Sequence, residues 1–431
     1  MSSTSSPSVP PTAFEAIHPT VQSAFFPGSN LKLEQVHIFS RHGERTPVRV
    51  RMTNLFPIRW NMCHVGREFD AAVLEETGSS GILRVNRKVD VPRGPTKEVA
   101  KDGDCLLGEL TDIGRKTSLA LGQSLRKLYV DELGFLPSSP NAADLFLRST
   151  SMSRTIETLQ QITTGLYPSS TRGSWRPDVH IRNPTEESLY PNTFSCARLR
   201  DLDKQFSRAA ALAYNDTLKP LDKKIGKHVG GKEIRVDSNP SASGIMDSIR
   251  AAEANGLKIP AEFNDPDVRD TLERAIVSEW FGGVLTSNEV RTLASGRLLS
   301  DLQHEMADKV AGKKDSVKMA VLACHDTTLA SMLATLGVFD NRWPDFTAHV
   351  SVELFSTPPE PTTLFSRWTK PTPPRHYVRF RYQNKPLALP ACAQPENHLT
   401  GVPELCTFEA FQKAVEKVTP LDWEKECARE E

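Results

Sequence analysis

The chain contains 431 residues, more than one compact hydrophobic core usually organises, and this length predicts one large elaborated domain or two closely associated ones. The 53 basic and 53 acidic residues balance, so the chain lacks the basic surplus that broad binding to nucleic acid or anionic membranes requires. Hydrophobic residues make up 38%, as in soluble globular proteins, and about the longest apolar run is Met319–Cys324, which excludes a membrane-spanning helix.

Residues 1–30 are rich in Ser, Thr and Pro and contain no Lys or Arg, so they match neither a secretory signal nor a mitochondrial presequence. We expect a disordered tail here and a cytoplasmic protein. The seven cysteines show no CxxC or mixed Cys/His metal spacing, and a cytosolic chain keeps its cysteines as thiols. The sequence therefore favours free thiols and indicates no metal site.

Strands and helices alternate in the first part of the chain. Leu33–Phe39 is β-rich and apolar, as in a central buried strand, whereas residues 50–105 are rich in Arg, Gly and Pro and predict an irregular insertion. A helix is expected to open at Thr111. It is followed by a strand at Leu145–Leu147, a helix from Ser153 to about Gly165 and a strand at Asp178–Arg182.

Residues 197–285 are polar, mostly helical and free of β-rich runs, which predicts a helical cap inserted into an α/β core. The core is expected to be discontinuous, formed by 31–196 and 286–431. Its second part holds a helix from Ser287 to about Lys309 and strands at Val317–Ala323, Val350–Phe355 and Tyr377–Tyr382. A Pro-rich stretch between the last two strands predicts a long surface hairpin loop.

The strongest chemical signal is the run Arg41–Pro47 (RHGERTP), which directly follows the first strand. Ligands of open α/β sheets lie beyond the carboxyl ends of the strands. Arginine forks match phosphate oxygens, and Gly43 lets the backbone approach a ligand closely. The histidine between the two arginines, His42, can attack phosphorus while the arginines neutralise the charge that it approaches.

Two further segments join a strand to a helix in the same way. His325 and Asp326 directly follow the strand MAVLAC and begin a helix. The N-terminus of a helix favours phosphate oxygens. Arg148–Thr155 (RSTSMSRT) places Arg154 in the first turn of a helix, where a cation opposes the macrodipole unless an anion lies nearby. Each segment alone is compatible with an ordinary helix cap or an exposed arginine, but three such loops are difficult to treat as independent accidents.

Together these motifs resemble the histidine phosphatase superfamily, and specifically its acid-phosphatase branch. The matching segments, in the expected order, are Arg41–Pro47 (RHGxRxP), Leu110–Gly114 (LTxxG), Arg148–Thr155 (RSTxxxRT) and His325–Asp326 (HD). The resemblance implies a three-layer α/β fold of the phosphoglycerate-mutase type, with a mixed, mostly parallel sheet and an inserted helical cap.

The resemblance also implies a role for each residue. His42 would be the nucleophile that becomes phosphohistidine, and Asp326 the proton donor. The phosphate would be bound by Arg41, Arg45, Arg154 and His325. His42 must attack as a neutral imidazole with its other nitrogen held by a backbone carbonyl, and bound phosphate should raise the pKa of Asp326. No cofactor is implied, and the expected partner is a small-molecule phosphate monoester.

Several alternatives stay open. A catalytically silent phosphate-binding module and a phosphotransferase or mutase of the same superfamily share these motifs. The substrate can be a lysophospholipid, a sugar phosphate or an inositol phosphate, and the oligomeric state is not predicted. Trp60 and Phe69 are more readily explained by packing than as a lipid pocket. Secreted relatives form disulfides at positions that match Cys196 with Cys427 and Cys392 with Cys406, against the thiols expected of a cytosolic chain.

Overall fold

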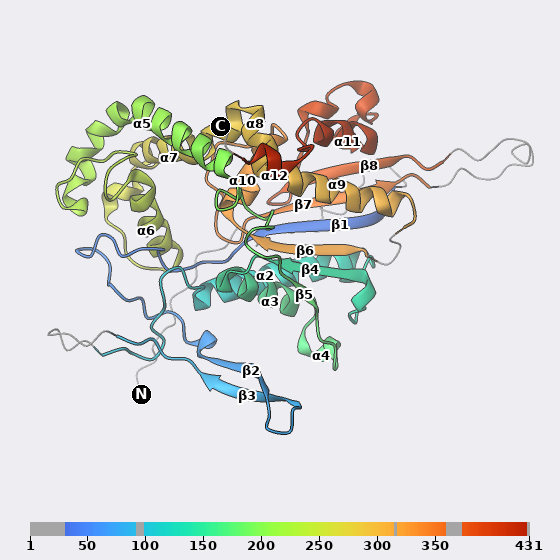
Figure 1. The fold of residues 1–431 in the computed structure, drawn as a ribbon, viewed down its shortest axis with the longest axis horizontal. Helices are drawn as coiled ribbons and strands as arrows, with labels where there is room; N and C mark the ends of the chain where they lie inside the picture. The colour runs from blue at the N-terminus through green and yellow to red at the C-terminus, as the bar shows by residue number, and fades with distance from the viewer. Residues whose placement is uncertain (1–30, 92–98, 314–316, 359–372, 429–431) are drawn as a thin grey trace, which may run out of the picture.

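The computed structural model describes residues 31–91, 99–313, 317–358 and 373–428. The predicted tail 1–30 and most of the Pro-rich loop lie outside these ranges. A nine-stranded sheet runs through the middle of the molecule in the order β10-β11-β8-β7-β1-β6-β4-β5, with β9 paired to β8 (Figure 1). The predicted α/β class with a mixed sheet is confirmed.

The centre of the sheet consists of β1 (Lys32–Arg41), β6 (Met319–Cys324) and β4 (Leu145–Ser149), which run parallel to one another. All six residues of β6 are buried, as expected of a strand covered on both faces. On the other side of β1 lies β7 (His349–Ser356), which is antiparallel to β1. The next strand, β8 (His376–Tyr382), is antiparallel to β7.

Short strands complete the two edges. They are β5 (Val179–His180) beside β4, and β9 (Lys385–Leu387), β10 (His398–Leu399) and β11 (Val402–Thr407) beyond β7. β5 is shorter than the predicted strand Asp178–Arg182, and the last three strands were not predicted. β9 and β10 have only three and two residues, too few for an alternating pattern, and β11 (VPELCT) has a Pro and a Glu in place of a β-rich run.

Helices cover both faces of the sheet and make the core three-layered. One face packs against α2 (Asp112–Arg126) and α3 (Ser153–Leu166). The other packs against α9 (Arg297–Val310), α10 (Asp326–Thr335) and α11 (Phe408–Glu416). The predicted helix from Ser287 is α8 (Asn288–Arg291), a π-helical turn at Thr292–Gly296, and α9.

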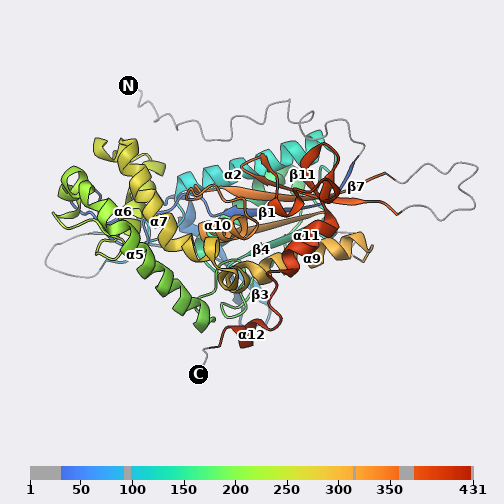
Figure 2. The ribbon, with the colours of Figure 1, turned by 90° about the horizontal axis from the view of Figure 1, so that it is seen from above.

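Residues 197–285, called the helical insert below, carry α5 (Ala197–Ile225), α6 (Ala242–Ala254) and α7 (Pro266–Thr286). These helices share a hydrophobic cluster with residues of the 50–105 segment, among them Trp60. Trp60 is only 4% exposed, so its predicted packing role is confirmed. In both views α5, α6 and α7 lie together at one end of the molecule (Figures 1 and 2).

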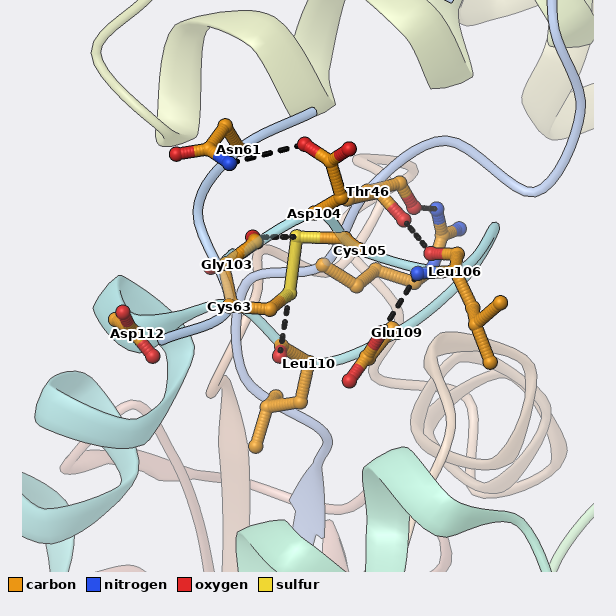
Figure 3. Close-up of a disulfide and its surroundings, with 12 residues drawn as sticks. Thr46, Asn61, Cys63, Gly103, Asp104, Cys105, Leu106, Glu109, Leu110 and Asp112 are labelled. Carbon is orange, nitrogen blue, oxygen red and sulfur yellow. Dashed lines mark hydrogen bonds between the residues drawn. A yellow bond between two sulfur atoms is a disulfide. The ribbon is translucent and has the colours of Figure 1, made fainter. Parts of the chain in front are cut away.

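The 50–105 segment is more regular than predicted. It contains a hairpin of β2 (Glu68–Leu74) and β3 (Ser80–Asn86), which the surrounding Arg, Gly and Pro residues concealed. A disulfide between Cys63 and Cys105 closes the base of the segment (Figure 3). Next to it the Asn61 side-chain amide donates to the Asp104 carboxylate at 2.9 Å. Phe69 on this hairpin is 47% exposed, so the packing role predicted for it is wrong.

The expectation of free thiols is wrong for six of the seven cysteines. Cys196 pairs with Cys427 and Cys392 with Cys406, as the family resemblance implied, and the Cys63–Cys105 pair was not anticipated. Cys324 is the remaining, buried thiol. Partners 231 positions apart in the sequence leave no local signal, so spacing rules could not find them. Among the described residues, no helix is both long and apolar enough to cross a membrane.

Candidate active site

The three predicted loops converge because β1, β6 and β4 are parallel neighbours whose carboxyl ends share one edge of the sheet. Arg41 lies opposite Cys324 in the register of β1 and β6, and Ser149 lies opposite Ala323. The His42 backbone N–H donates to the Cys324 carbonyl at 3.1 Å, which fixes the first loop against the second. In Figure 1 the strands β1 and β6 point toward the helical insert.

The first loop packs tightly on the start of α2, which explains the spacing of the LTxxG segment. A Cβ atom on Gly43 would collide with the Gly114 carbonyl, and one on Gly114 would collide with the backbone of Glu44. The Thr111 hydroxyl caps α2 by accepting from the Gly114 N–H at 3.2 Å. Only glycine at both positions allows this approach, so α2 serves as the support of the loop that carries His42.

His42 is 2% exposed, and its Nδ1 lies 2.9 Å from the Gly43 carbonyl oxygen. The carbonyl can only accept, so Nδ1 carries the proton and Nε2 keeps its lone pair. Burial lowers the pKa of His42 well below 6.5, and the nearby charges of Arg154 and Arg41 lower it further. The hydrogen bond and the lowered pKa both favour the predicted neutral imidazole held by a backbone carbonyl.

His325 lies beside His42, with 5.7 Å between the ring centroids. Its Nε2 is 3.1 Å from the Thr150 hydroxyl, and its backbone N–H donates to the Thr328 hydroxyl at 3.1 Å. Burial and the charge of Arg154 lower the pKa of His325 to about 3. Both histidines are neutral at ordinary pH, and the positive charge of the site comes from arginine.

Asp326 opens α10 and forms an ion pair with Arg41, with 2.8 Å between Oδ2 and Nη2. The Trp343 indole N–H donates to the same oxygen at 3.0 Å. Burial alone would raise the pKa of Asp326, but Arg41 and Arg45 outweigh it, so the pKa lies below the ordinary value. Without a ligand, the lowered pKa favours the ionised form of Asp326.

Each of the three arginines has a different environment. Arg41 donates to the Pro344 carbonyl at 2.5 Å and lies over the Phe346 ring at 4.1 Å. Arg45 pairs with Asp247 of α6, with 2.8 Å between Nη1 and Oδ1. Arg154 has no carboxylate within ion-pair distance among the described residues. Its side chain contacts the Met152 sulfur at 2.9 Å, and burial lowers its pKa to about 10.

These side chains line one cavity of about 410 Å³. It contains all six predicted site residues: Arg41, His42, Arg45, Arg154, His325 and Asp326. Neither Trp60 nor Phe69 lines it. Its other walls come from the helical insert, with Met246, Asp247, Ile276 and Trp280, and from the loop before β7, with Trp343 and Phe346.

These wall residues were not predicted from the sequence. Asp247 and Ile276 lie in helices whose apolar residues are explained by packing, and nothing in the local sequence shows that one turn faces a cavity. Trp343 and Phe346 precede the predicted strand Val350–Phe355 by only a few residues, but aromatic residues in a loop carry no distinguishing signal. Among the described residues, no group of three His, Cys, Asp or Glu side chains is arranged to hold a metal ion.

Comparisons with known proteins agree with this geometry. The family model described as histidine phosphatase superfamily (branch 2) matches residues 32–383. A probable acid phosphatase of Schizosaccharomyces pombe is 33% identical over 92% of this chain and 94% of its own length. The human lysophosphatidic acid phosphatase type 6 is 27% identical over 76% of this chain and 74% of its own.

Solved structures show the same fold at low sequence identity. A Bifidobacterium longum multiple inositol polyphosphate phosphatase, in complex with inositol hexasulfate, has a TM-score of 0.60 at 10% identity and covers 94% of this chain and 97% of its own. The Hafnia alvei phytase in complex with tartrate has a TM-score of 0.58 at 15% identity, with coverages of 93% and 99%. At these identities the likeness speaks for the fold alone.

Proposed function

The chain belongs to branch 2 of the histidine phosphatase superfamily, and on that premise we propose that it hydrolyses phosphate monoesters through a phosphohistidine formed on His42. The observation that carries this proposal is the hydrogen bond from His42 Nδ1 to the Gly43 carbonyl, which leaves Nε2 unprotonated inside a cavity lined by arginines. Family membership makes the protein a phosphatase; the chemical roles below are our proposal.

In the first step Nε2 of His42 attacks phosphorus, the N–P bond forms and the P–O bond to the leaving group breaks. Arg41, Arg45 and Arg154 bind the phosphoryl oxygens and stabilise the charge that develops on them. His325 is neutral and can donate one hydrogen bond to the phosphoryl group. The low pKa of His42 favours the attack, because the nucleophile needs no deprotonation.

Asp326 supplies the proton that the leaving oxygen needs. In the free site its carboxylate is neutralised by Arg41. When a phosphate group binds Arg41, it competes for that charge and adds a negative charge next to Asp326, and both effects raise the pKa of Asp326. Substrate binding thus prepares the acid. In the second step Asp326 accepts a proton from water, which attacks phosphorus, and the N–P bond to His42 breaks to release inorganic phosphate.

The lining of the cavity bears on the substrate. Beyond the phosphate site the walls include Met246, Ile276, Trp280 and Trp343. These apolar and aromatic side chains can pack against an ester whose organic part is apolar or aromatic, beside the charged side chains of the same walls. We propose lysophospholipids or aryl phosphates as the first substrates to test, and the lysophosphatidic acid phosphatase relative agrees with the former.

The direct test is a phosphate-release screen over aryl, sugar, inositol and lysophospholipid monoesters. Quenching with a ³²P-labelled ester should leave an acid-labile, base-stable label on the wild-type protein. His42→Ala should abolish both label and turnover. Label that survives in this variant would place the nucleophile elsewhere. Binding of phosphate without turnover of any ester would favour the silent module, and transfer to an added alcohol in place of release would favour the phosphotransferase.

A further inference from the structure

We propose that Asp247 is a specificity-determining residue, which restricts the cavity to esters that carry a single phosphate group. The inference rests on the proposed function and narrows its substrate class. The arrangement of charged side chains around the cavity supports this inference. Five arginines face the cavity, Arg41, Arg45, Arg51, Arg154 and Arg250, together with four acidic residues, Asp203, Asp247, Glu273 and Asp326.

Asp247 lies on α6 of the helical insert and engages two arginines of the first loop at once. Its Oδ1 is 2.8 Å from Arg45 Nη1, and its Oδ2 is 3.2 Å from Arg51 Nη1. The backbone N–H of Val48 donates to Oδ2 at 3.2 Å. With three donors on one carboxylate and a side chain only 16% exposed, Asp247 is fixed in place. It compensates the charge that would otherwise make Arg51 a second anion site.

The fifth arginine is neutralised separately. Arg250 Nη2 lies 2.5 Å from Glu273 Oε1, and its Nη1 donates to the Trp343 carbonyl at 3.3 Å. Arg41 is paired with Asp326. Among the described residues, Arg154 is thus the one cavity arginine without a carboxylate within ion-pair distance, while Arg45 and Arg51 share a single one. Arg154 lies in the first turn of α3, directly after β4, and so on the same edge of the sheet as His42 and His325.

Five arginines and four carboxylates leave one surplus positive charge over the whole cavity. At the phosphate site Arg41, Arg45 and Arg154 exceed Asp326 by two charges, whereas in the rest of the cavity the carboxylates outnumber the arginines by one. One phosphate group therefore finds Arg154 free and displaces Asp326 from Arg41. A second phosphate group on the same substrate would meet Asp247, Asp203 or the apolar walls, without an unpaired cation to receive it. Like-charge contact in a partly buried site is unfavourable, so a bisphosphate should be bound far less well than a monophosphate.

The test uses Asp247→Asn, which keeps the shape of the side chain and removes its charge. The substrates are hydroquinone monophosphate and hydroquinone bisphosphate, aryl esters of the class proposed above that differ by one phosphate group. We expect the bisphosphate-to-monophosphate ratio of kcat/KM to rise by about tenfold or more in the variant, because Arg51 becomes free. The gain should shrink with added salt, as expected for a charge effect. Asp247→Ser, which removes the same charge, is a second variant should the amide disturb folding.

Asp203→Asn is the matched control. Asp203 lines the same cavity but has no arginine or lysine within ion-pair distance among the described residues, so its removal frees no cation. In Asp203→Asn the bisphosphate-to-monophosphate ratio of kcat/KM should change by less than about threefold. An equal rise of this ratio in Asp203→Asn and Asp247→Asn would show a general effect of removing negative charge and would overturn the assignment to Asp247. An unchanged ratio in folded Asp247→Asn and Asp247→Ser would overturn it as well.

Binding measurements separate this inference from the proposed function. Calorimetric titration with inorganic phosphate and with pyrophosphate reports the same selectivity without any turnover. If wild type binds pyrophosphate weakly and Asp247→Asn binds it more tightly, the inference is supported, whether or not any ester is hydrolysed. Absence of ester hydrolysis would refute only the proposed function. Wild-type protein that binds pyrophosphate as tightly as phosphate would overturn the inference.

Discussion

His42 combines burial with close positive charges, and this sets the pH range in which it can attack. Its pKa lies well below 6.5, so the neutral form that attacks is present above that lowered value and is lost only at more acidic pH. We expect kcat/KM for nitrophenyl phosphate not to fall between pH 7 and pH 5. For a histidine of ordinary pKa, about 6.5, the neutral fraction would fall by about 25-fold over this range. A decline with a midpoint near pH 6.5, measured at constant ionic strength, would contradict the assignment.

Asp326 should matter in proportion to how much the leaving group needs a proton. Alkoxides depend on general acid catalysis, which typically contributes 10²–10⁴-fold, whereas nitrophenolate leaves readily without it. Asp326→Asn should therefore slow the phosphorylation of His42 far more with alkyl phosphates than with nitrophenyl phosphate. Burst kinetics isolate this step from the later hydrolysis, in which Asp326 also acts.

Glu44 provides the comparison for this experiment. It follows His42 closely in the sequence and its pKa is raised by burial, but its carboxylate contacts the Thr117 hydroxyl and does not line the cavity. Glu44→Gln should show no dependence on the leaving group. Equal loss of the burst rate on both ester types in Asp326→Asn would remove Asp326 as the donor.

At the scale of elements, a buried charge cluster joins β7 and β8 to the segment after α2. Glu353 of β7 contacts Arg379 at 2.7 Å, Arg381 at 2.8 Å and the Tyr129 hydroxyl at 2.7 Å. The carboxylate is 0% exposed. Glu353→Gln leaves two buried arginines without their carboxylate, and breaking such a cluster typically costs about 3–5 kcal/mol. Urea denaturation at pH 7 measures this loss.

The same cluster predicts a dependence on pH. Burial alone would raise the pKa of Glu353, but Arg379 and Arg381 lower it from 4.5 to about 2. A lowered pKa in the folded state means that the stabilisation is complete above the unfolded value and is lost as the pH falls toward the folded one. The stability difference between wild type and Glu353→Gln should therefore shrink between about pH 4.5 and pH 2. A constant difference would contradict the charge-based interpretation.

The elements also differ in how far the sequence predicts them. β6 and β4 were predictable because each is an apolar run that ends in a loop of His, Asp, Arg or Ser, a pattern typical of a buried strand that leads into a site. The hairpin β2–β3 was not, because its residues stay largely exposed and so follow no core pattern. The six predicted site residues could be found in the same way, because all of them lie close to the ends of core strands. Asp247 and Trp343 could not, because they reach the cavity only through the packing of the helical insert and of the loop before β7.

At the scale of the whole molecule, the Cys196–Cys427 disulfide ties the start of α5 to the C-terminal region. The loop it closes spans 231 positions, against 14 for Cys392–Cys406. In the chain-entropy model the longer loop stabilises by about 2 kcal/mol more. The double variant Cys196→Ser/Cys427→Ser should accordingly lose more unfolding free energy than Cys392→Ser/Cys406→Ser. Equal losses, measured by denaturant titration, would show that strain or residual structure dominates over loop entropy.

The disulfides also bear on where the protein works. The expected cytoplasmic location stays a prediction, and three disulfides weigh against it because reducing compartments keep cysteines as thiols. Mass spectrometry of alkylated protein taken directly from cells would decide the point. Six blocked cysteines that become reactive only after reduction are expected if the pairs form in the cell.

The order of the strands has a consequence for the newborn polypeptide on the ribosome. β1, which carries His42 at its end, is synthesised near the start, yet β6, its parallel neighbour, begins only at Met319, after the whole helical insert. Until then the long edge of β1 has no partner on that side, and His42 has neither His325 nor Asp326 beside it. Translation must therefore pass the helical insert before the nascent chain can acquire any phosphatase chemistry, and a chain released early would carry the nucleophile without the rest of its site.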